Sequence, residues 1–171
     1  FRSVLARVLV SPQFLYRIES QRPGKSPQPI GDYEIASRLS YMIWSSIPDE
    51  RLLRLAAKNQ LSRRDVRRQQ IRRMLADPRS RALAIEFGTQ WLEVRAFDQF
   101  QGKDEKLFPT FTTQLRAAMN EESIHFFADV FRLDRPFSAL LDSDHTYLNE
   151  QLAKHYGIQG VKGKAFRKVT G

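Results

Sequence analysis

Glu122 and His125 are the first pair of residues whose types and spacing could do chemistry. They stand three positions apart in a stretch with helical apolar spacing, so both side chains are expected on one side of a helix. Di-iron carboxylate bundles use this Glu-x-x-His spacing to hold metal ions. Such sites need a second motif of the same kind and further carboxylates, and neither His145 nor His155 follows a Glu at that spacing. We therefore expect no metal site in this chain.

His145 is the second candidate, within "SDHTYLNEQLAKHYG" at 143–157. Asp144 precedes it, and a carboxylate beside an imidazole can take part in general acid–base chemistry. The structural alternative, which we favour, is that Asp144 caps a short helix and that His145 lies in the turn. No Gly-rich phosphate loop, G-x-S-x-G motif or zinc-type His spacing accompanies these residues.

Glu122 also has a structural interpretation, because it falls on the apolar stripe of its own helix. Arg38 poses the same problem in "YEIASRLSYMIWSSI" at 33–47, where Glu34 and Arg38 are the charged residues. A buried charge costs free energy unless it is paired, and a bidentate Arg–carboxylate contact satisfies both groups. We therefore predict that Arg38 and Glu122 each have a charged or backbone partner, and most simply each other, as a structural ion pair. Because a helix that is apolar on most sides is normally central, we expect 33–47 to be buried.

The elements that position these residues are predicted from the apolar pattern, which recurs with a period near 3.6 and is interrupted at Pro and Gly. It predicts an all-α fold: an irregular bundle of about seven helices with an extended C-terminal tail. We divide the chain into a helical segment at 1–19, a main helical domain at 32–157 and a tail at 158–171. The Pro- and Gly-rich "QRPGKSPQPIGD" separates the first two. The tail is expected to be an extended arm or a strand that lacks its partner.

Three positions have specific expected roles within these helices. Asp32 and Ser62 precede apolar periodic stretches, so each is expected as an N-cap. Gly88 interrupts the helical stretch "SRALAIEFGTQWLEV" and is expected where two helices cross closely.

Positive charge is concentrated in one segment. The chain has a net charge of +9, and the eight Arg and two Asp of 62–81 supply a net +6 of it. No aromatic residue is interleaved with these arginines, so base stacking is not indicated and we expect no specific nucleic-acid binding. Three alternatives remain open: a charge-driven nucleic-acid contact, a docking surface for an acidic neighbouring domain, and a solvated helix face.

Composition excludes several other classes. The chain has no Cys, so it has no disulfide, thiolate zinc site or covalent haem attachment of its own, and we expect no cofactor within it. No apolar run approaches the ~18 residues that a membrane span requires. The chain opens on "FRSVLARVLV" rather than on a Met, which we interpret as a fragment or a processed product.

Five stretches carry a family resemblance: "FRSVLARVLVSPQFLYRIE", "DYEIASRLSYMIWSSIPDERLLRLA", "RRMLADPRSRALAIEFGTQWLEV", "LFPTF" and "YLNEQLAKHYGI", in that order. Together they resemble the domain of unknown function 1592, preceded by the end of its usual neighbour, the domain of unknown function 1595. The resemblance covers nearly the whole chain. It implies a large exported multidomain protein of the planctomycete type, periplasmic or extracellular, that often carries c-type haem modules elsewhere. It offers no catalytic residues to carry over.

Three hypotheses on function follow. The first is a non-catalytic helical module that packs against sister domains of an exported, haem-associated protein. The second is a domain that contributes acid–base residues to an enzyme acting on extracellular polymer, with Glu122, His125 and His145 as the expected catalytic residues. The third is nucleic-acid binding through the Arg-rich helix. A solvent-open cleft holding Glu122 and His125 would favour the second over the first.

Overall fold

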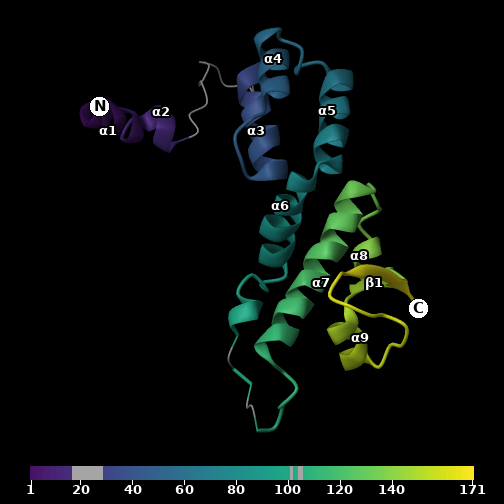
Figure 1. Cartoon of the computed structure of the whole chain (residues 1–171). Helices are drawn as coiled ribbons and strands as arrows, with labels where there is room; N and C mark the ends of the chain where they lie inside the picture. Colours follow the sequence, from purple (N-terminus) through teal and green to yellow (C-terminus); the bar gives the residue numbers. More distant parts are fainter. Residues whose placement is uncertain (17–28, 101, 104–105) are drawn as a thin grey trace.

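The computed structural model describes residues 1–16, 29–100, 102–103 and 106–171. Within them the chain is mostly helical, with one small two-stranded sheet (Figure 1). The elements are α1 (Arg2–Leu9), α2 (Pro12–Leu15), α3 (Asp32–Trp44), α4 (Glu50–Ala57), α5 (Arg64–Ala76), η1 (Pro78–Ser80), α6 (Arg81–Leu83), η2 (Ala84–Thr89), η3 (Phe97–Gln99), α7 (Thr113–Arg132), α8 (Ala139–Asp142), β1 (His145–Leu148), α9 (Glu150–Tyr156) and β2 (Arg167–Thr170). The predicted all-α class is thus correct only in its coarser form, a mostly helical fold. The predicted loop at 21–32 lies largely outside the described residues.

Helices α3, α4 and α5 form one layer of the molecule, at the top of Figure 1. Its core consists of fully buried aliphatic side chains around Leu52, Leu61 and Met74. Trp44 ends α3 and ties it to α5, because its indole Nε1 donates a hydrogen bond of 3.0 Å to the Met74 carbonyl. The guanidinium of Arg79 covers the same ring at 3.5 Å from its centroid.

Asp32 and Ser62 do not cap helices as the sequence predicted. Gly31 is the N-cap of α3 and Arg63 that of α5, whereas Asp32 is buried within the first turn of α3. The Asp32 carboxylate accepts hydrogen bonds from the amide of Leu61, at 2.5 Å, and from the amide and hydroxyl of Ser62. Because these donors belong to the connection between α4 and α5, Asp32 fixes that connection against α3.

The prediction that α3 is buried on most sides is wrong for the described residues. One face carries buried Ile35, Ala36 and Ile43, but Met42 is 68% exposed on the other side. Arg38 is exposed as well, and it lines a shallow surface hollow that also includes Ser62 and other residues of this layer. Some apolar residues of α3 are therefore left uncovered by the described part of the chain.

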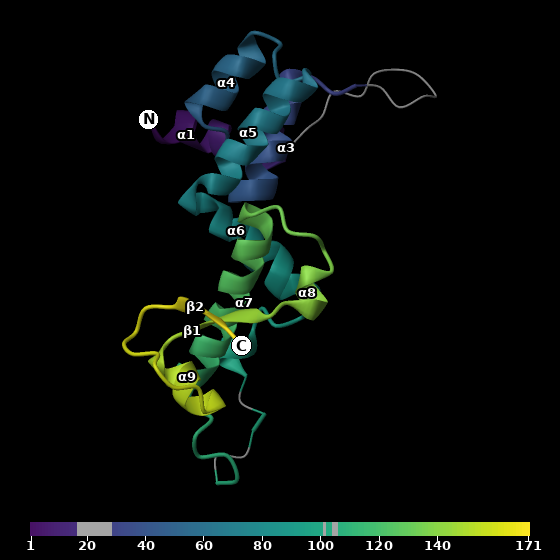
Figure 2. The same cartoon turned by 90° about the vertical axis from the view of Figure 1, so that its right-hand side faces the viewer.

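The second layer is built around the 20-residue helix α7, which Thr112 caps by accepting the Leu115 amide. The helical stretch that ends in η2 runs beside α7 (Figures 1 and 2). The predicted close crossing at Gly88 is confirmed, because a Cβ built there would lie 2.5 Å from Cδ2 of Phe127. Residues Ala84–Thr89 form a π-helical turn at this crossing, a local widening that often accompanies functional sites.

The tail does not lack a partner, so that prediction is wrong. Strand β2 pairs antiparallel with β1, with His145 opposite Thr170 and Leu148 opposite Arg167. Residues 145–148 are accordingly a strand rather than a turn before a helix, and the helix that follows is capped by Asn149 rather than by Asp144. Side chains of the tail, namely Val161, Phe166 and Val169, pack against a core formed by α7, β1 and α9. The tail is therefore part of the second layer.

No helix within the described ranges is both long enough and apolar enough to cross a membrane.

Candidate functional site

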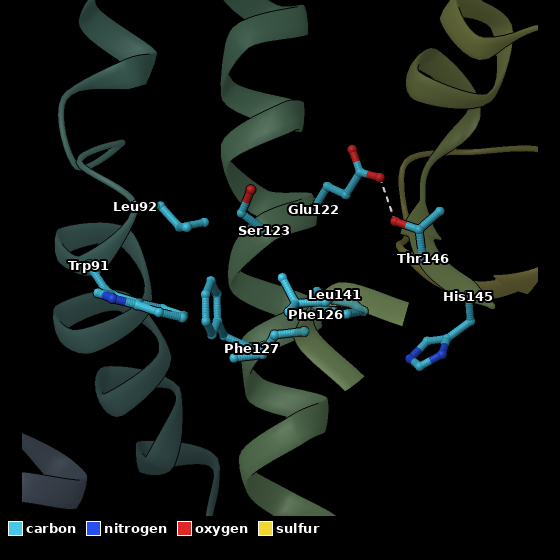
Figure 3. Close-up of a pocket in the computed structure, with 10 residues that line it drawn as sticks. Trp91, Leu92, Glu122, Ser123, Phe126, Phe127, Leu141, His145 and Thr146 are labelled. Carbon is cyan, nitrogen blue, oxygen red and sulfur yellow. Dashed lines mark hydrogen bonds between the residues drawn. The ribbon is translucent and has the colours of Figure 1, made fainter. Parts of the chain in front are cut away.

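A pocket of about 330 Å³ lies between the helical stretch before residue 92, helix α7, helix α8 and strand β1 (Figure 3). Its walls are mostly apolar, and Trp91, Leu92, Phe126, Phe127 and Leu141 supply them. Its polar side chains are Glu122, Ser123, His145 and Thr146. Two of the three predicted acid–base residues, Glu122 and His145, thus line one pocket, while His125 does not.

Glu122 takes its hydrogen bonds from hydroxyl groups. The Thr146 hydroxyl donates to Oε1, and the Tyr156 hydroxyl donates to Oε2 at 2.8 Å. Burial and this neighbouring carboxylate raise the pKa of Tyr156 above its ordinary value, so the phenol remains a donor. The predicted ion pair with Arg38 is therefore replaced by two hydroxyl contacts, and Arg38 lies exposed in the other layer. Residue spacing correctly predicted that Arg38 and Glu122 lie on helices. It does not show which faces of two helices pack against each other.

His145 is held between two carboxylates. Its Nε2 lies 3.2 Å from Oδ2 of Asp129, and its Nδ1 lies 3.4 Å from Oδ1 of Asp144. Its side chain is only 2% exposed. Because both ring nitrogens already face protein acceptors, neither points at the pocket as a ready proton acceptor.

Asp129 is the centre of a charged network that joins α7 to the sheet. Besides His145 it accepts a hydrogen bond from Arg135 Nε at 2.9 Å and one from Tyr147, and Lys168 of β2 lies 3.9 Å away. Burial alone would raise the pKa of Asp129, but the Tyr147 hydrogen bond and the charges of Arg135 and Lys168 outweigh it and lower the pKa. Burial and Asp129 in turn raise the pKa of Tyr147 to about 12.

His125 projects to a different part of α7 from the pocket. Its ring stacks between Tyr147, at a centroid distance of 5.7 Å, and Phe166, at 4.9 Å. Burial and the nearby charge of Arg81 lower the pKa of His125, although Glu121 partly opposes them. The Glu-x-x-His pair therefore does not converge on a common point. Among the described residues, no three His, Cys, Asp or Glu side chains gather as a metal-binding group.

The outer wall of the pocket continues into a group of aromatic rings that is partly exposed. We call Phe87, Trp91, Phe127, Phe131 and Phe137 the aromatic cluster. Trp91 connects its members, with its ring centroid 5.3 Å from that of Phe137 and 6.0 Å from that of Phe87. Trp91 is 49% exposed and Phe137 61%. The apolar pattern predicted a helix here but not this surface, because periodicity does not say how much of an apolar stripe the rest of the chain covers.

The Arg-rich segment contains arginines that pair with carboxylates and arginines that are exposed on one face of α5. Arg73 binds Asp49 at 2.7 Å, Arg79 binds Asp77 at 2.9 Å and Arg81 binds Glu121 at 2.7 Å. The first pair joins α5 to the start of α4, the third joins α6 to α7, and the Arg79–Asp77 pair closes the turn after α5. A stripe at positions i, i+4 and i+8 stays exposed on α5, and it consists of Arg64, Arg68 and Arg72.

The family of the chain follows from its sequence match. The sequence pattern of a family described as "Protein of unknown function (DUF1592)" matches residues 30–158. No curated protein and no solved structure matches the chain. The family match extends from the start of α3 to the end of α9, so every residue that lines the pocket lies within it. The chain belongs to the DUF1592 family of proteins of unknown function.

Proposed function

We propose that this chain is a non-catalytic helical module that packs against a neighbouring domain through the apolar surface around the pocket. The observation that carries the proposal is the exposure of large apolar side chains beside one another. Trp91 contacts Phe137 and shares the pocket with Leu141, which is 91% exposed. Contiguous exposed apolar surface of this kind marks interaction sites, and aromatic residues are enriched at the centres of protein interfaces.

The neighbour that fits best is a sister domain of the same parent protein. The resemblance described above supports a large exported protein, periplasmic or extracellular, in which residues 1–19 would be the end of a preceding domain related to the domain of unknown function 1595. It also supports c-type haem in that protein, which would be attached in another module because this chain has no Cys. In this arrangement the exposed Met42 face of α3 is a further surface for a sister domain.

The acid–base alternative has one observation in its favour, the pocket that Glu122 and His145 share. Their contacts weigh against it. Both carboxylate oxygens of Glu122 accept hydroxyl hydrogen bonds, both nitrogens of His145 face carboxylates, and His125 stacks elsewhere. A general base must be within hydrogen-bond reach of the proton it removes, and in this structure the hydrogen bonds of Glu122 and His145 go to structural partners, while His125 lies outside the pocket.

The docking proposal is tested by adding one charge to the apolar surface. We expect Leu141→Asp to weaken binding of the neighbouring domain, supplied as a separate chain, by about 10- to 100-fold, because a buried Leu contributes about 1.5–3 kcal/mol. Calorimetric titration measures the affinity. Leu141 is almost fully exposed, so this chain's own unfolding midpoint should not change. The matched control is Leu107→Asp, at a Leu that is 74% exposed and does not line the pocket. Equal losses in the two variants would refute the docking surface.

The Arg stripe is expected not to bind nucleic acid with sequence preference. Arg64, Arg68 and Arg72 can neutralise phosphates, but no aromatic side chain lines their surface hollow to stack on bases. Binding to single- and double-stranded oligonucleotides of varied sequence should therefore be weak, similar among sequences and lost as salt rises. Fluorescence anisotropy at physiological salt measures it. Sub-micromolar affinity for one sequence over others would contradict the expectation.

A further inference from the structure

The pocket differs in charge from the rest of the protein. The chain has 28 Lys and Arg residues and a net charge of +9, yet none of those that the structure describes lines the pocket. Its lining contains one carboxylate, that of Glu122, and one imidazole, that of His145. The carboxylates of Asp129 and Asp144 face that imidazole. Among the described lining residues, Glu122 therefore supplies the carboxylate, whereas the nearby charge of Asp129 is compensated by Arg135 and Lys168.

The Glu122 carboxylate lacks a cationic partner among the described residues. Its hydrogen bonds come from the neutral hydroxyls of Thr146 and Tyr156. A carboxylate offers about four lone-pair directions, and these two contacts use half of them. Since Glu122 is half-buried, its charge is only partly solvated, and a cation placed beside it would gain more than at an exposed carboxylate.

The walls of the pocket suit the body of an organic cation. Figure 3 shows Phe126 and Leu141 below Glu122, and Phe127 and Trp91 to the left of α7; all four line the pocket. Aromatic faces attract cations through their quadrupole, and aliphatic side chains such as Leu141 cover apolar groups. The volume of about 330 Å³ lies at the lower end of the range for small-ligand sites. A ligand with a compact head and a short apolar body fits this volume.

We propose that the pocket binds an alkyl- or arylalkylammonium group, with its ammonium head at Glu122 and its apolar body between Trp91 and Leu141. This inference rests on the proposed function, since it treats the pocket as a binding site rather than a reactive one. Two sources supply the same chemistry: a free primary amine, and a lysine side chain of the docked domain. A neutral ligand of the same shape would lose the contact with the carboxylate and keep only the apolar contacts.

The test compares three probes of one shape: 2-phenylethylammonium, 2-phenylethanol and 3-phenylpropionate. NMR titration of the whole chain should show the ammonium bound at least about tenfold more tightly than the alcohol, and the carboxylate most weakly. Glu122→Gln should bring the ammonium and the alcohol to nearly equal affinity. The matched control is Glu121→Gln, because Glu121 is the adjacent residue and pairs with Arg81 outside the pocket. It should retain the preference for the ammonium.

A second experiment distinguishes a free primary amine from a lysine side chain of the docked domain. A short apolar peptide with one lysine is compared with the same peptide carrying Nε-acetyl-lysine. Preference for the unmodified peptide or for the free ammonium supports the inference and identifies the source that binds more tightly. Equal binding of ammonium and alcohol, an unchanged preference in Glu122→Gln, or no binding of any cationic probe overturns it. If the neighbouring domain still binds and Leu141→Asp still weakens that binding as expected, the proposed function survives this failure.

Discussion

Asp129→Ala should destabilise the fold by about 3 kcal/mol, because it removes the carboxylate that faces His145, Arg135 and Lys168 together. The side chain of Asp129 is only 11% exposed, and that of His145 is 2% exposed. Loss of one member of a buried charged pair costs about 3–5 kcal/mol. The lower end applies here, since Arg135 and Lys168 are 30% and 39% exposed and can turn toward solvent. The expected fall in Tm is about 6–12 °C.

A matched control comes from the other carboxylate on the same imidazole. Asp144 lies 3.4 Å from His145, but its side chain is 79% exposed, so Asp144→Ala should cost under about 1 kcal/mol. Urea denaturation at pH 7 measures both variants. Equal losses at the two positions would show that contact with His145 matters rather than the buried network around Asp129.

The lowered pKa of Asp129 also predicts how the stability of the wild-type protein changes in acid. Its pKa is lower in the folded state than the ordinary 3.8, so the unfolded chain binds a proton more readily than the folded one. The contribution of the ionised Asp129 to the free energy of unfolding is fully present above the ordinary pKa. It is lost as the pH falls through the lowered pKa of the folded state. Asp129→Asn removes this contribution, so its unfolding free energy should fall less steeply than that of the wild type below about pH 4.

Gly88→Ala should destabilise the protein by about 1–2 kcal/mol. Helix propensity alone favours Ala over Gly by about 0.5–1 kcal/mol. The added Cβ would lie 2.5 Å from the Phe127 ring, and overpacking of a core costs about 1–3 kcal/mol. The ring cannot easily move away, because Phe127 is 3% exposed and stacks on Phe131 at 6.1 Å. Steric cost therefore outweighs propensity.

A double-mutant cycle with Phe127→Leu tests this explanation of Gly88. The smaller, flexible Leu leaves room for the Cβ, so the two substitutions together should cost less than the sum of their separate costs. Because Phe127 lines the pocket, Gly88→Ala should also reduce the affinity for 2-phenylethylammonium. Additive losses of stability would place the effect of Gly88 elsewhere than at this contact.

The sequence predicted the helices well and their crossing at Gly88, because both follow from local rules: a 3.6-residue period and a missing Cβ. It failed where two distant segments determine the outcome. The strand at 145–148 carries only four residues and pairs with 167–170, and strand propensity depends on such context. Nothing within "HTYL" itself indicates that partner, so the stretch was interpreted as a turn before a helix.

For the candidate site, too, local features could be predicted from the sequence and contacts between distant segments could not. The sequence identified Glu122 and His145 as unusual, and the structure does bring both to one pocket. The sequence could not predict their partners. Thr146 meets Glu122, and Asp129 meets His145, only because β1 lies along α7. The predicted pairing of Arg38 with Glu122 was wrong because it was inferred from charge alone. Both residues required a partner by charge, but the choice of partner is made by the packing of the layers.

The late position of β2 in the sequence has a consequence for synthesis on the ribosome. The core of the α3–α5 layer is complete once Met74 has been added, whereas β1 obtains its partner only with Arg167–Thr170. At about 5–20 residues per second, these events are separated by about 5–20 s. During the last part of that interval, the roughly 1–4 s between Leu148 and Thr170, the nascent chain carries a formed helical layer and an unpaired edge strand that will become one wall of the pocket. A chaperone that shields unpaired strands would have its period of action there, before the pocket exists.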